Sequence, residues 1–230
     1  MNSAIIVAAG TGSRFGSETP KQFLEILGKP VIVHTLESFE SCPQIDEIIL
    51  VLSAAETGNF RKIAEKYNFK KLKKTIAGGG TRGESVWNGL CAIDSQTCEI
   101  VAVHDGARPL VLVEEITKTI EKARETGAAC LVAAVTETIK EISGDKIVQT
   151  IDRAKLRRAL TPQAFRYEIL KRAFEMNNFI EATDESILVE NLGVEVSIVE
   201  GSARNIKITH AEDLILAESL LKQFKVQGSK

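Results

Sequence analysis

A glycine-rich segment near the start of the chain is the first place where residue types suggest chemistry. Residues 8–16 read AAGTGSRFG and follow a short apolar run. Glycines directly after a buried strand let the backbone approach a ligand closely and offer N–H donors to an anion. Arg14 lies in this segment and Lys21 follows it, and a guanidinium with an ammonium there would bind the oxygens of a polyphosphate. The pairing favours phosphate contact over the alternative, a packing turn with two solvated charges.

Two known phosphate-binding motifs do not fit this segment. The P-loop requires GxxxxGK followed by Ser or Thr, and no Gly-Lys-Ser/Thr occurs there. The dinucleotide motif GxGxxG requires glycine at position 15, where the chain has Phe15. A nicotinamide-dependent dehydrogenase is therefore not indicated.

A second glycine-rich segment, residues 78–86, reads GGGTRGESV. It follows a predicted strand over residues 74–77 and opens a predicted helix. Its backbone N–H groups and the Ser85 hydroxyl could read a base edge or a ribose. The alternative is that Ser85 only caps the helix, with Glu84 in the first turn.

A third polar segment, residues 103–109, reads VHDGARP at the end of an apolar run. Ligands of open α/β sheets bind beyond the carboxyl ends of the strands, so Asp105 is placed to bind a ribose hydroxyl or a Mg²⁺ that bridges phosphates. The chain has only three histidines. We therefore expect His104 to make structural hydrogen bonds rather than to act as a base or a metal ligand.

Other polar groups adjoin apolar structure further along the chain, at residues 152–153 (DR), 160–165 (LTPQAF), 183–185 (TDE) and 205–209 (NIKIT). None of these segments is interpretable alone. Lys207 stands inside the strand-like NIKIT segment, where a lysine is unusual, although a lysine on an edge strand also protects against aggregation.

The elements that must position these groups alternate along the chain. Continuous apolar runs, typical of parallel strands buried on both faces, occupy residues 4–9, 48–52, 100–103 and 130–135. Helical patterns occupy residues 31–40, 58–67, 84–93, 113–126, 167–177 and 211–224, with a further strand at 194–199. Strands that alternate with helices predict a doubly wound α/β fold.

The middle of the chain interrupts this alternation. Residues 139–142 alternate apolar and polar, Ser143-Gly144-Asp145 follows, and residues 147–151 form a second strand-like run. This pattern predicts an antiparallel hairpin with a glycine turn. We interpret it as an arm, residues 137–158, inserted in a single domain of residues 1–230 to reach a partner subunit.

The composition of the whole chain excludes several classes of partner. The formal net charge is −2, from 29 Lys and Arg against 31 Asp and Glu, whereas a duplex-binding protein usually carries a basic surplus. Aromatic residues make up only 5%, which argues against stacking on single strands. No apolar run approaches the ~20 residues of a membrane span, and the start lacks a signal-peptide pattern. We expect a cytoplasmic protein that binds neither nucleic acid nor membrane.

The cysteines agree with that expectation. Cys42, Cys91, Cys98 and Cys130 are scattered, with no CxxC pair and no histidine at metal-ligand spacing. They predict reduced thiols, some buried as small hydrophobic side chains, and no structural zinc.

Taken in order, these segments resemble one family closely, the 2-C-methyl-D-erythritol 4-phosphate cytidylyltransferases of the non-mevalonate isoprenoid pathway. The resemblance runs from Ala8 to Leu214 and is carried by AAGTGSR, PKQFL, GGGTRGESV, VHDGARP, LTPQAF, TDE and NIKIT followed by EDL. It implies a Rossmann-like, three-layer, mostly parallel α/β domain of the nucleotide-diphospho-sugar transferase type, whose projecting hairpin arm builds a homodimer. It also implies transfer of CMP from CTP to 2-C-methyl-D-erythritol 4-phosphate, with Mg²⁺, giving 4-diphosphocytidyl-2-C-methyl-D-erythritol and pyrophosphate.

The same resemblance implies roles for individual residues. Those expected to bind CTP are Ala8, Ala9, Gly10, Gly12, Gly79, Gly80, Ser85, Asp105 and Gly106. The implied catalytic residues are Arg14 and Lys21, which stabilise the transition state, together with Arg153 and Lys207. Those expected at the sugar phosphate are Arg108, Thr183 and Lys207, completed by Thr138 and Arg153 from the arm of a second subunit. Asp105 is also the candidate Mg²⁺ ligand, with the ion held mainly by the triphosphate.

Two positions depart from the family pattern. Position 80 is glycine where some members carry an acidic residue, so a side-chain contact to the base is lost there. Position 106 is glycine where alanine is common, which we expect to matter little for a backbone contact.

The implied chemistry agrees with the residues available. A phosphate oxygen is already ionised at pH 7, so this nucleophile needs no general base, and the sequence shows no convincing Ser-His-Asp or Cys-His set. Catalysis must then come from positioning and from neutralising charge around an in-line α-phosphate.

Two alternatives remain open from the sequence. A ribitol-5-phosphate cytidylyltransferase resembles this family in the same motifs, although AAG in the first loop and ALTPQ favour the erythritol phosphate. A non-catalytic nucleotide-binding regulatory protein could keep the glycine-rich loops, but it would have no reason to keep Arg14, Lys21, Arg153 and Lys207 together.

Overall fold

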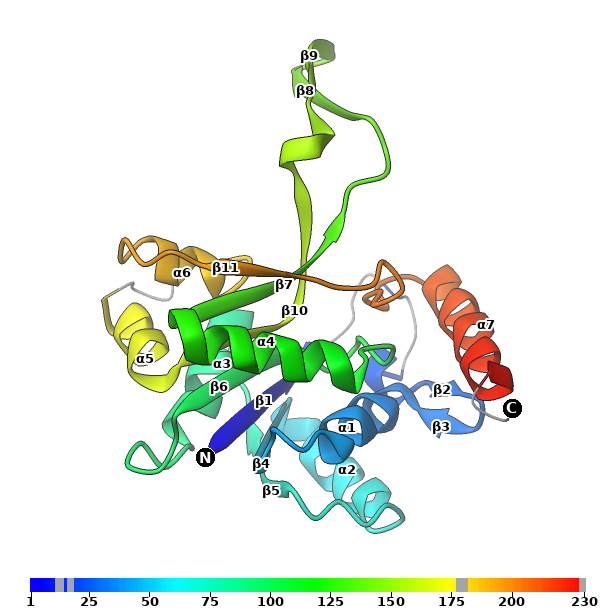
Figure 1. Ribbon diagram of the computed structural model, residues 1–230. Helices are drawn as coiled ribbons and strands as arrows, with labels where there is room; N and C mark the ends of the chain where they lie inside the picture. Colours follow the sequence, from blue (N-terminus) through cyan, green and yellow to red (C-terminus); the bar gives the residue numbers. More distant parts are fainter. Residues whose placement is uncertain (11–14, 16–18, 177–181, 228–230) are drawn as a thin grey trace.

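A mostly parallel sheet forms the centre of the computed structural model, which describes residues 1–10, 15, 19–176 and 182–227 (Figure 1). Within these residues the strand order is β11-β7-β10-β6-β1-β4-β5. The strands are β1 (Asn2–Ala8), β4 (Glu47–Leu52), β5 (Leu72–Ala77), β6 (Ile100–Asp105), β7 (Ala128–Ala134), β10 (Arg157–Arg166) and β11 (Ser197–Glu200). All neighbours pair in parallel except β10, which is antiparallel to both β6 and β7. The predicted three-layer α/β fold is confirmed.

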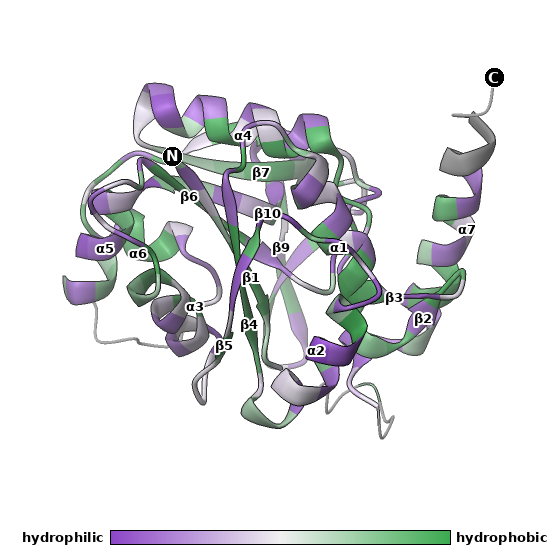
Figure 2. Cartoon of the chain, turned by 90° about the horizontal axis from the view of Figure 1, so that it is seen from below, coloured by the Kyte–Doolittle hydropathy of each residue, from purple (hydrophilic) through white to green (hydrophobic). Residues whose placement is uncertain are grey.

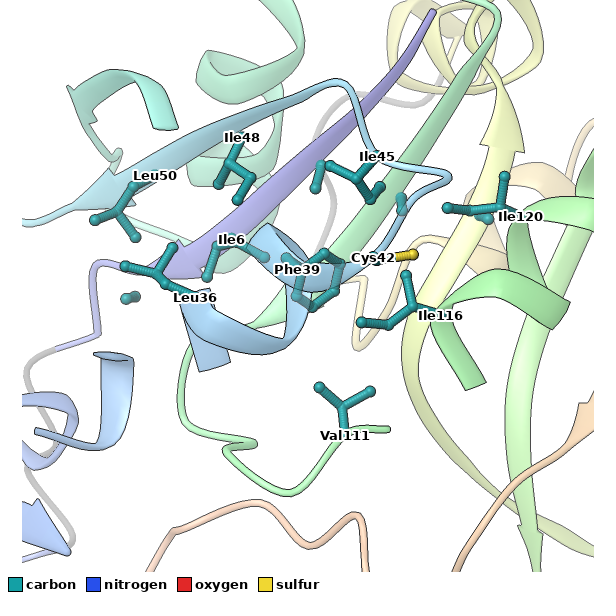
Figure 3. Packing of buried hydrophobic residues seen from close by; sticks show 14 of the residues in the cluster. Ile6, Leu36, Phe39, Cys42, Ile45, Ile48, Leu50, Val111, Ile116 and Ile120 are labelled. Atoms are coloured by element: carbon teal, nitrogen blue, oxygen red, sulfur yellow. The ribbon is translucent and has the colours of Figure 1, made fainter. Parts of the chain in front are cut away.

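Helices cover both faces of this sheet because its central strands are apolar on both sides. Ala4 and Ile6 of β1 join a buried cluster with the helices α1 (Val31–Ser41), α2 (Thr57–Ala64) and α4 (Val113–Thr126), as Figure 3 shows for Ile6 beside Leu36 and Phe39. Ile5 points to the other face and joins a cluster with α3 (Arg82–Cys91), α5 (Tyr167–Met176) and α6 (Ser186–Glu190). In Figure 2 the hydrophobic strands β1 and β4 lie between the helices that cover them.

The sequence patterns located most of these elements. The run predicted at 113–126 is α4 with the same bounds, and the other predicted helices lie within a few residues of those observed. Strand β10 was missed, because Pro162 cannot donate to a strand ladder and argues against a central strand. The pairing of β10 with β7 is irregular between Ala159 and Gln163, and this interruption accommodates the proline. Helix α6 was also missed.

The expectation that NIKIT is strand-like was wrong. Residues 205–209 are not assigned to any helix or strand. The strand predicted at 194–199 is present as β11, but it begins three residues later, at Ser197. Ile208 N–H donates to the carbonyl of Ala107 at 2.8 Å, and Lys207 turns toward Asp105. Lys207 therefore does not serve to protect an edge strand against aggregation. Its ammonium makes an ion pair with Asp105 instead.

The predicted hairpin is present and projects from the body of the molecule (Figure 1). It consists of β8 (Ile139–Ser143) and β9 (Lys146–Ile151), with Gly144 at φ +59° in the turn. Ile142 and Ile147 are register partners on this hairpin, and their exposed fractions are 67% and 63%. This cross-strand pair therefore presents apolar side chains to solvent.

The remaining elements are the 3₁₀ helices η2 (Lys21–Phe23) and η3 (Ala54–Glu56), the strands β2 (Glu25–Ile26) and β3 (Lys29–Pro30), and the helix α7 (Ala211–Gln227). A third 3₁₀ helix, η4 (Arg153–Lys155), follows β9 on the arm. The four cysteines are free thiols, as predicted. Among the described residues, no helix combines the length and apolar character needed to cross a membrane.

Candidate active site

A cavity of about 600 Å³ opens at the carboxyl ends of the central strands. Chain segments that follow β1, β4, β5 and β6 all reach it, as expected for a ligand site of an open α/β sheet. Its described lining residues are Val7, Ala8, Ala9, Gly10, Lys21, Gln22, Ser53, Ala54, Gly78, Gly79, Gly80, Thr81, Arg82, Ser85, Asp105, Ala107, Lys207 and Thr209. The structure thus brings together most of the predicted nucleotide-binding residues in one cleft.

The loop after β1 is anchored by a buried glutamine. Gln22 Nε2 donates to the carbonyl of Ala8 at 2.8 Å and to that of Gly10 at 3.4 Å. The C=O and the following N–H of a trans peptide point in opposite directions, so the Ala9 N–H faces away from Gln22. Gly12 and Arg14 lie outside the described residues.

The second glycine segment is folded by a capping box rather than by a Ser85 cap. The Thr81 hydroxyl accepts from Glu84 N–H, and the Glu84 carboxylate accepts from Thr81 N–H. Ser85 is buried, donates to the carbonyl of Thr81 at 2.9 Å and accepts from Gly79 N–H at 3.2 Å. The alternative expectation for Ser85 was therefore wrong, because Thr81 caps the helix and Ser85 shapes the glycine turn.

Close packing requires glycine at one position of this turn, Gly78, but not at another, Gly80. A Cβ at Gly78 would lie 2.5 Å from the Cβ of Ala9 and 2.6 Å from Ser85 Oγ, so only glycine fits there. A Cβ at Gly80 would meet only Glu84 Oε2, at 3.2 Å, and this is the end of a flexible side chain. Position 80 thus has room for a larger side chain.

Asp105 is the centre of the charge in the cleft. Its Oδ2 lies 3.0 Å from Lys207 Nζ and 3.2 Å from Arg108 Nε, and its Oδ1 lies 3.2 Å from Arg82 Nε. Burial alone would raise the pKa of this carboxyl group, but Arg82, Lys207 and Arg108 outweigh it and hold the pKa well below its ordinary value. Asp105 is therefore ionised at neutral pH.

Arg82 links Asp105 to a second buried carboxylate. Its Nη1 and Nη2 lie 2.5 Å and 3.1 Å from the two carboxylate oxygens of Glu185, which is 1% exposed. Burial opposes the charged guanidinium, but Glu185 and Asp105 more than compensate and raise the pKa of Arg82. Burial raises the pKa of Glu185 above its ordinary value, against the attraction of Arg82.

His104 has the structural role that was expected. It is fully buried below Asp105, where burial lowers its pKa to about 3. Thr161 Oγ accepts from Asp105 N–H at 3.2 Å and lies 3.0 Å from His104 Nδ1, while Nε2 lies 3.2 Å from the carbonyl of Arg108. Because the Arg108 carbonyl can only accept, Nε2 must carry the proton. The Thr161 hydroxyl then donates to Nδ1.

The segment that carries Lys207 also holds Lys21. Lys21 Nζ donates to the carbonyl of Ile208 at 2.7 Å. Thr209 N–H and His210 N–H both donate to Asp213 Oδ2, which fixes the end of this segment at the start of α7. Lys21 and Lys207 therefore both line the same cavity.

Gly106 is more constrained than expected. A Cβ there would lie 2.8 Å from the Cβ of Ala8 and 2.8 Å from Ile32 Cδ1. In this chain an alanine at position 106 would push against the end of β1. The glycine thus matters for packing beside the first loop, beyond any backbone contact to the ligand.

The other predicted residues do not line the cavity within the described part of the chain. Arg108 lies behind Asp105 and donates through Nη1 to the carbonyl of Asn205 at 2.9 Å. Thr183 is exposed in the turn that precedes Glu185. Thr138 and Arg153 are exposed on the arm, where Arg153 Nη1 donates to the carbonyl of Thr136.

Four residues that shape the site were not predicted from the sequence, namely Gln22, Arg82, Thr161 and Glu185. Each lies inside a segment that the sequence had marked, and Arg82 follows directly on the second glycine run. Their roles depend on contacts between distant segments, such as those of Arg82 with Asp105 and Glu185, which local spacing does not reveal.

The described residues offer little to a resident metal ion. None of them form a group of three or more His, Cys, Asp or Glu side chains that could hold one. Asp105 is the one carboxylate among the described lining residues, and cations occupy both of its oxygens. This donor set fits an ion that enters with a polyphosphate rather than one bound by the protein alone.

Comparison with known proteins gives one consistent result. The family model of 2-C-methyl-D-erythritol 4-phosphate cytidylyltransferase matches residues 2–223. A protein of that name from Alkaliphilus metalliredigens is 43% identical over 227 residues, which cover 97% of this chain and 94% of the relative. Another from Clostridium perfringens is 44% identical over 224 residues, covering 95% and 98%.

A solved structure agrees with these relatives. The crystal structure of 4-diphosphocytidyl-2C-methyl-D-erythritol synthase from Anaerococcus prevotii is similar with a TM-score of 0.85 at 33% identity. The match covers 96% of each chain. The similarity therefore extends over the sheet, the helices and the segments that build the cleft.

Proposed function

This chain belongs to the family of 2-C-methyl-D-erythritol 4-phosphate cytidylyltransferases, and from this premise we propose how its strand-end cleft performs the reaction. As a member it is a nucleotidyltransferase that transfers CMP from CTP to 2-C-methyl-D-erythritol 4-phosphate and releases pyrophosphate, a step of isoprenoid biosynthesis. The observation that carries the assignment to this cleft is the convergence of Lys21, Lys207 and Asp105 with two glycine turns in one cavity.

In the proposed mechanism the glycine turns bind CTP and the cations stabilise the transition state. The backbone at Ala8, Ala9 and Gly10 borders the triphosphate, and the turn at Gly79, Gly80 and Ser85 borders the cytosine. Lys21 and Arg14 neutralise the charge that develops on the α-phosphate and on departing pyrophosphate. The phosphate of the second substrate binds beside Lys207, with Arg108 behind Asp105, and one of its oxygens attacks in line.

No general base is needed in this scheme. The attacking phosphate oxygen is ionised at pH 7, and the cavity lining, as far as it is described, contains no histidine. The buried His104 is neutral and holds the Arg108 carbonyl and the Thr161 hydroxyl, which in turn accepts from Asp105 N–H. The chain's contribution is therefore the placement of charges and donors before substrate arrives.

We propose that Mg²⁺ enters the site with the triphosphate. When bound, the ion supplies positive charge that screens the phosphate oxygens from the nucleophile. Asp105, the one carboxylate among the described lining residues, would contact the ion through an oxygen that it also shares with Arg82 or with Arg108 and Lys207, and these cations hold it ionised.

The test of the proposed function is pyrophosphate release with each of four nucleoside triphosphates and two polyol phosphates. We expect turnover with CTP and 2-C-methyl-D-erythritol 4-phosphate, and little with ribitol 5-phosphate, a substrate that the relatives' names do not favour. Turnover with ribitol 5-phosphate alone would overturn the choice of substrate. CTP binding without release for either polyol phosphate would favour a regulatory protein.

We further propose a homodimer in which the arm of each subunit completes the partner's site. The exposed pair of Ile142 and Ile147 supports this, because a projecting apolar hairpin gains stability by packing on a second chain. Thr138 and Arg153, at the base of the arm and outside their own chain's cavity lining, would then serve the sugar phosphate of the other subunit.

This arrangement predicts complementation between two inactive variants. Arg153→Ala removes only the arm contribution, and Lys21→Ala removes only the body contribution. An equal mixture, unfolded and refolded together, should recover about a quarter of the wild-type rate, since half of the random dimers regain one intact site. Pyrophosphate release by each variant alone and by the mixture measures this.

The control is a mixture of Lys21→Ala with Lys207→Ala, both of which alter the body of the same site. This mixture should recover nothing, while light scattering should report the mass of a dimer for all samples. Recovery by both mixtures, or by neither, would contradict a site shared between subunits through Arg153.

A further inference from the structure

We propose that Glu185 is a positioning residue of this reaction, which fixes Arg82 so that Arg82 in turn orients the Asp105 carboxylate toward bound CTP. The inference rests on the proposed function, because it takes Asp105 as a contact of the nucleotide. Under this proposal the TDE and LTPQAF segments act together, since Glu185 belongs to the first and its partner Gln163 to the second.

The contact between Glu185 and Arg82 has the geometry of a fixed pair. Both carboxylate oxygens of Glu185 are engaged, at 2.5 Å and 3.1 Å, by the two terminal nitrogens of Arg82. Two parallel N–H···O contacts define the plane of the guanidinium as well as its distance. Since Glu185 is 1% exposed, water does not compete for this pair.

The remaining nitrogen of Arg82 acts on Asp105. Arg82 Nε donates to Asp105 Oδ1 at 3.2 Å, whereas the ion pairs of Lys207 and Arg108 are made with Oδ2. Arg82 therefore determines the position of one carboxylate oxygen, and the other two cations determine that of the second. Arg82 and Asp105 both line the cavity, so a rotation of either would be felt there.

Glu185 is itself held by the sheet. Gln163 of β10, which is fully buried, accepts from Glu185 N–H and Ser186 N–H at 3.1 Å each and donates to Asp184 Oδ2 at 2.9 Å. Two residues earlier on the same strand, Thr161 accepts from Asp105 N–H. Strand β10 thus fixes Asp105 through its backbone and, by way of Glu185 and Arg82, through its carboxylate.

A purely structural ion pair would behave differently from a positioning residue. Loss of a structural pair lowers the fraction of folded enzyme, which lowers kcat and leaves KM unchanged. Loss of orientation at a substrate contact weakens the binding of CTP in the ground state and the transition state alike, which raises KM and leaves kcat nearly unchanged. The two roles are therefore separated by steady-state kinetics.

The variant that tests this is Glu185→Gln, which keeps the shape of the side chain and removes its charge. We expect KM for CTP to rise about tenfold with kcat within about threefold of wild type. Calorimetric titration with CTP in the absence of the polyol phosphate should show the same weakening. Glu185→Asp, which keeps the charge, should restore part of the affinity. The matched control is Glu190→Gln at the exposed end of α6, which should leave both constants unchanged.

A double variant tests whether Glu185 acts through Arg82. Arg82→Gln should raise KM for CTP, and Arg82→Gln/Glu185→Gln should be no worse than Arg82→Gln alone, because the second change has nothing left to position. Effects that multiply, or a Glu185→Gln variant with a wild-type KM or a loss in kcat only, would overturn the proposal. An inactive wild-type enzyme would instead refute the proposed function, so the two failures are distinguishable.

Discussion

Lys21→Ala is expected to lower kcat about 100-fold or more, the loss of roughly 3 kcal/mol that follows removal of a preorganised transition-state donor. Lys21 follows the first glycine-rich loop and lines the cavity. Its ammonium donates to the Ile208 carbonyl at 2.7 Å, which holds it in place. A charge already in place costs no reorganisation when the α-phosphate becomes five-coordinate, so its loss falls on the transition state. Pyrophosphate release at saturating substrates measures the effect.

The fold should tolerate this change. Lys21 begins the short helix η2, and its side chain is not part of the hydrophobic core. Thermal unfolding of Lys21→Ala should therefore stay close to wild type. Lys62→Ala, which removes an exposed lysine from α2, is the matched control and should change neither rate nor stability. Near wild-type turnover in Lys21→Ala would remove Lys21 from the mechanism.

Asp105→Asn should have the second large effect, and here stability is lost together with activity. The substitution leaves Arg82, Arg108 and Lys207 around a neutral amide and removes the one carboxylate that all three share, although Arg82 keeps Glu185. Removing one partner from a buried ionic network costs about 3–5 kcal/mol of unfolding free energy. Urea unfolding at pH 7 measures this loss, and Asp145→Asn in the exposed turn of the arm is the matched control.

The pH dependence of this loss has a definite sign. The cations hold the pKa of Asp105 below its ordinary value in the folded protein. Its ionised form therefore stabilises the fold above the pKa of the unfolded chain, about 4, and this contribution is lost as the pH falls toward the folded value. The difference in unfolding free energy between wild type and Asp105→Asn should be largest at neutral pH and shrink below about pH 4. A difference that grew on acidification would show that Asp105 is not held ionised.

Much of the site could be predicted from the sequence because strand ends can be located locally. The apolar runs of β1 and β6 are continuous, and polar groups stand directly after them, so Gly10 and Asp105 had to meet at one edge of the sheet. The glycine turn at Gly79 follows the same logic. These predictions needed only the burial pattern and the rule that parallel strands end together.

What was missed depends on contacts that local patterns do not encode. Strand β10 carries a proline and enters the sheet from the opposite direction, so its pattern did not indicate a central strand. With β10 unplaced, Thr161 and Gln163 could not be connected to His104, Asp105 or Glu185. The extended NIKIT segment was misread for a related reason, since a period-two pattern does not distinguish a strand from a chain segment bound to a neighbouring loop.

The way the arm joins the body has a consequence for how such enzymes can diverge. Strands β7 and β10 are antiparallel neighbours in the sheet, and residues 135–156 between them include no buried side chain. The arm is thus the extended tip of one long hairpin, and a turn of a few residues could replace it without disturbing the core. Changes in its length and sequence therefore leave the packing of the body intact. In the proposed dimer, the arm's share of the polyol-phosphate site could then change separately from the cleft that handles the nucleotide.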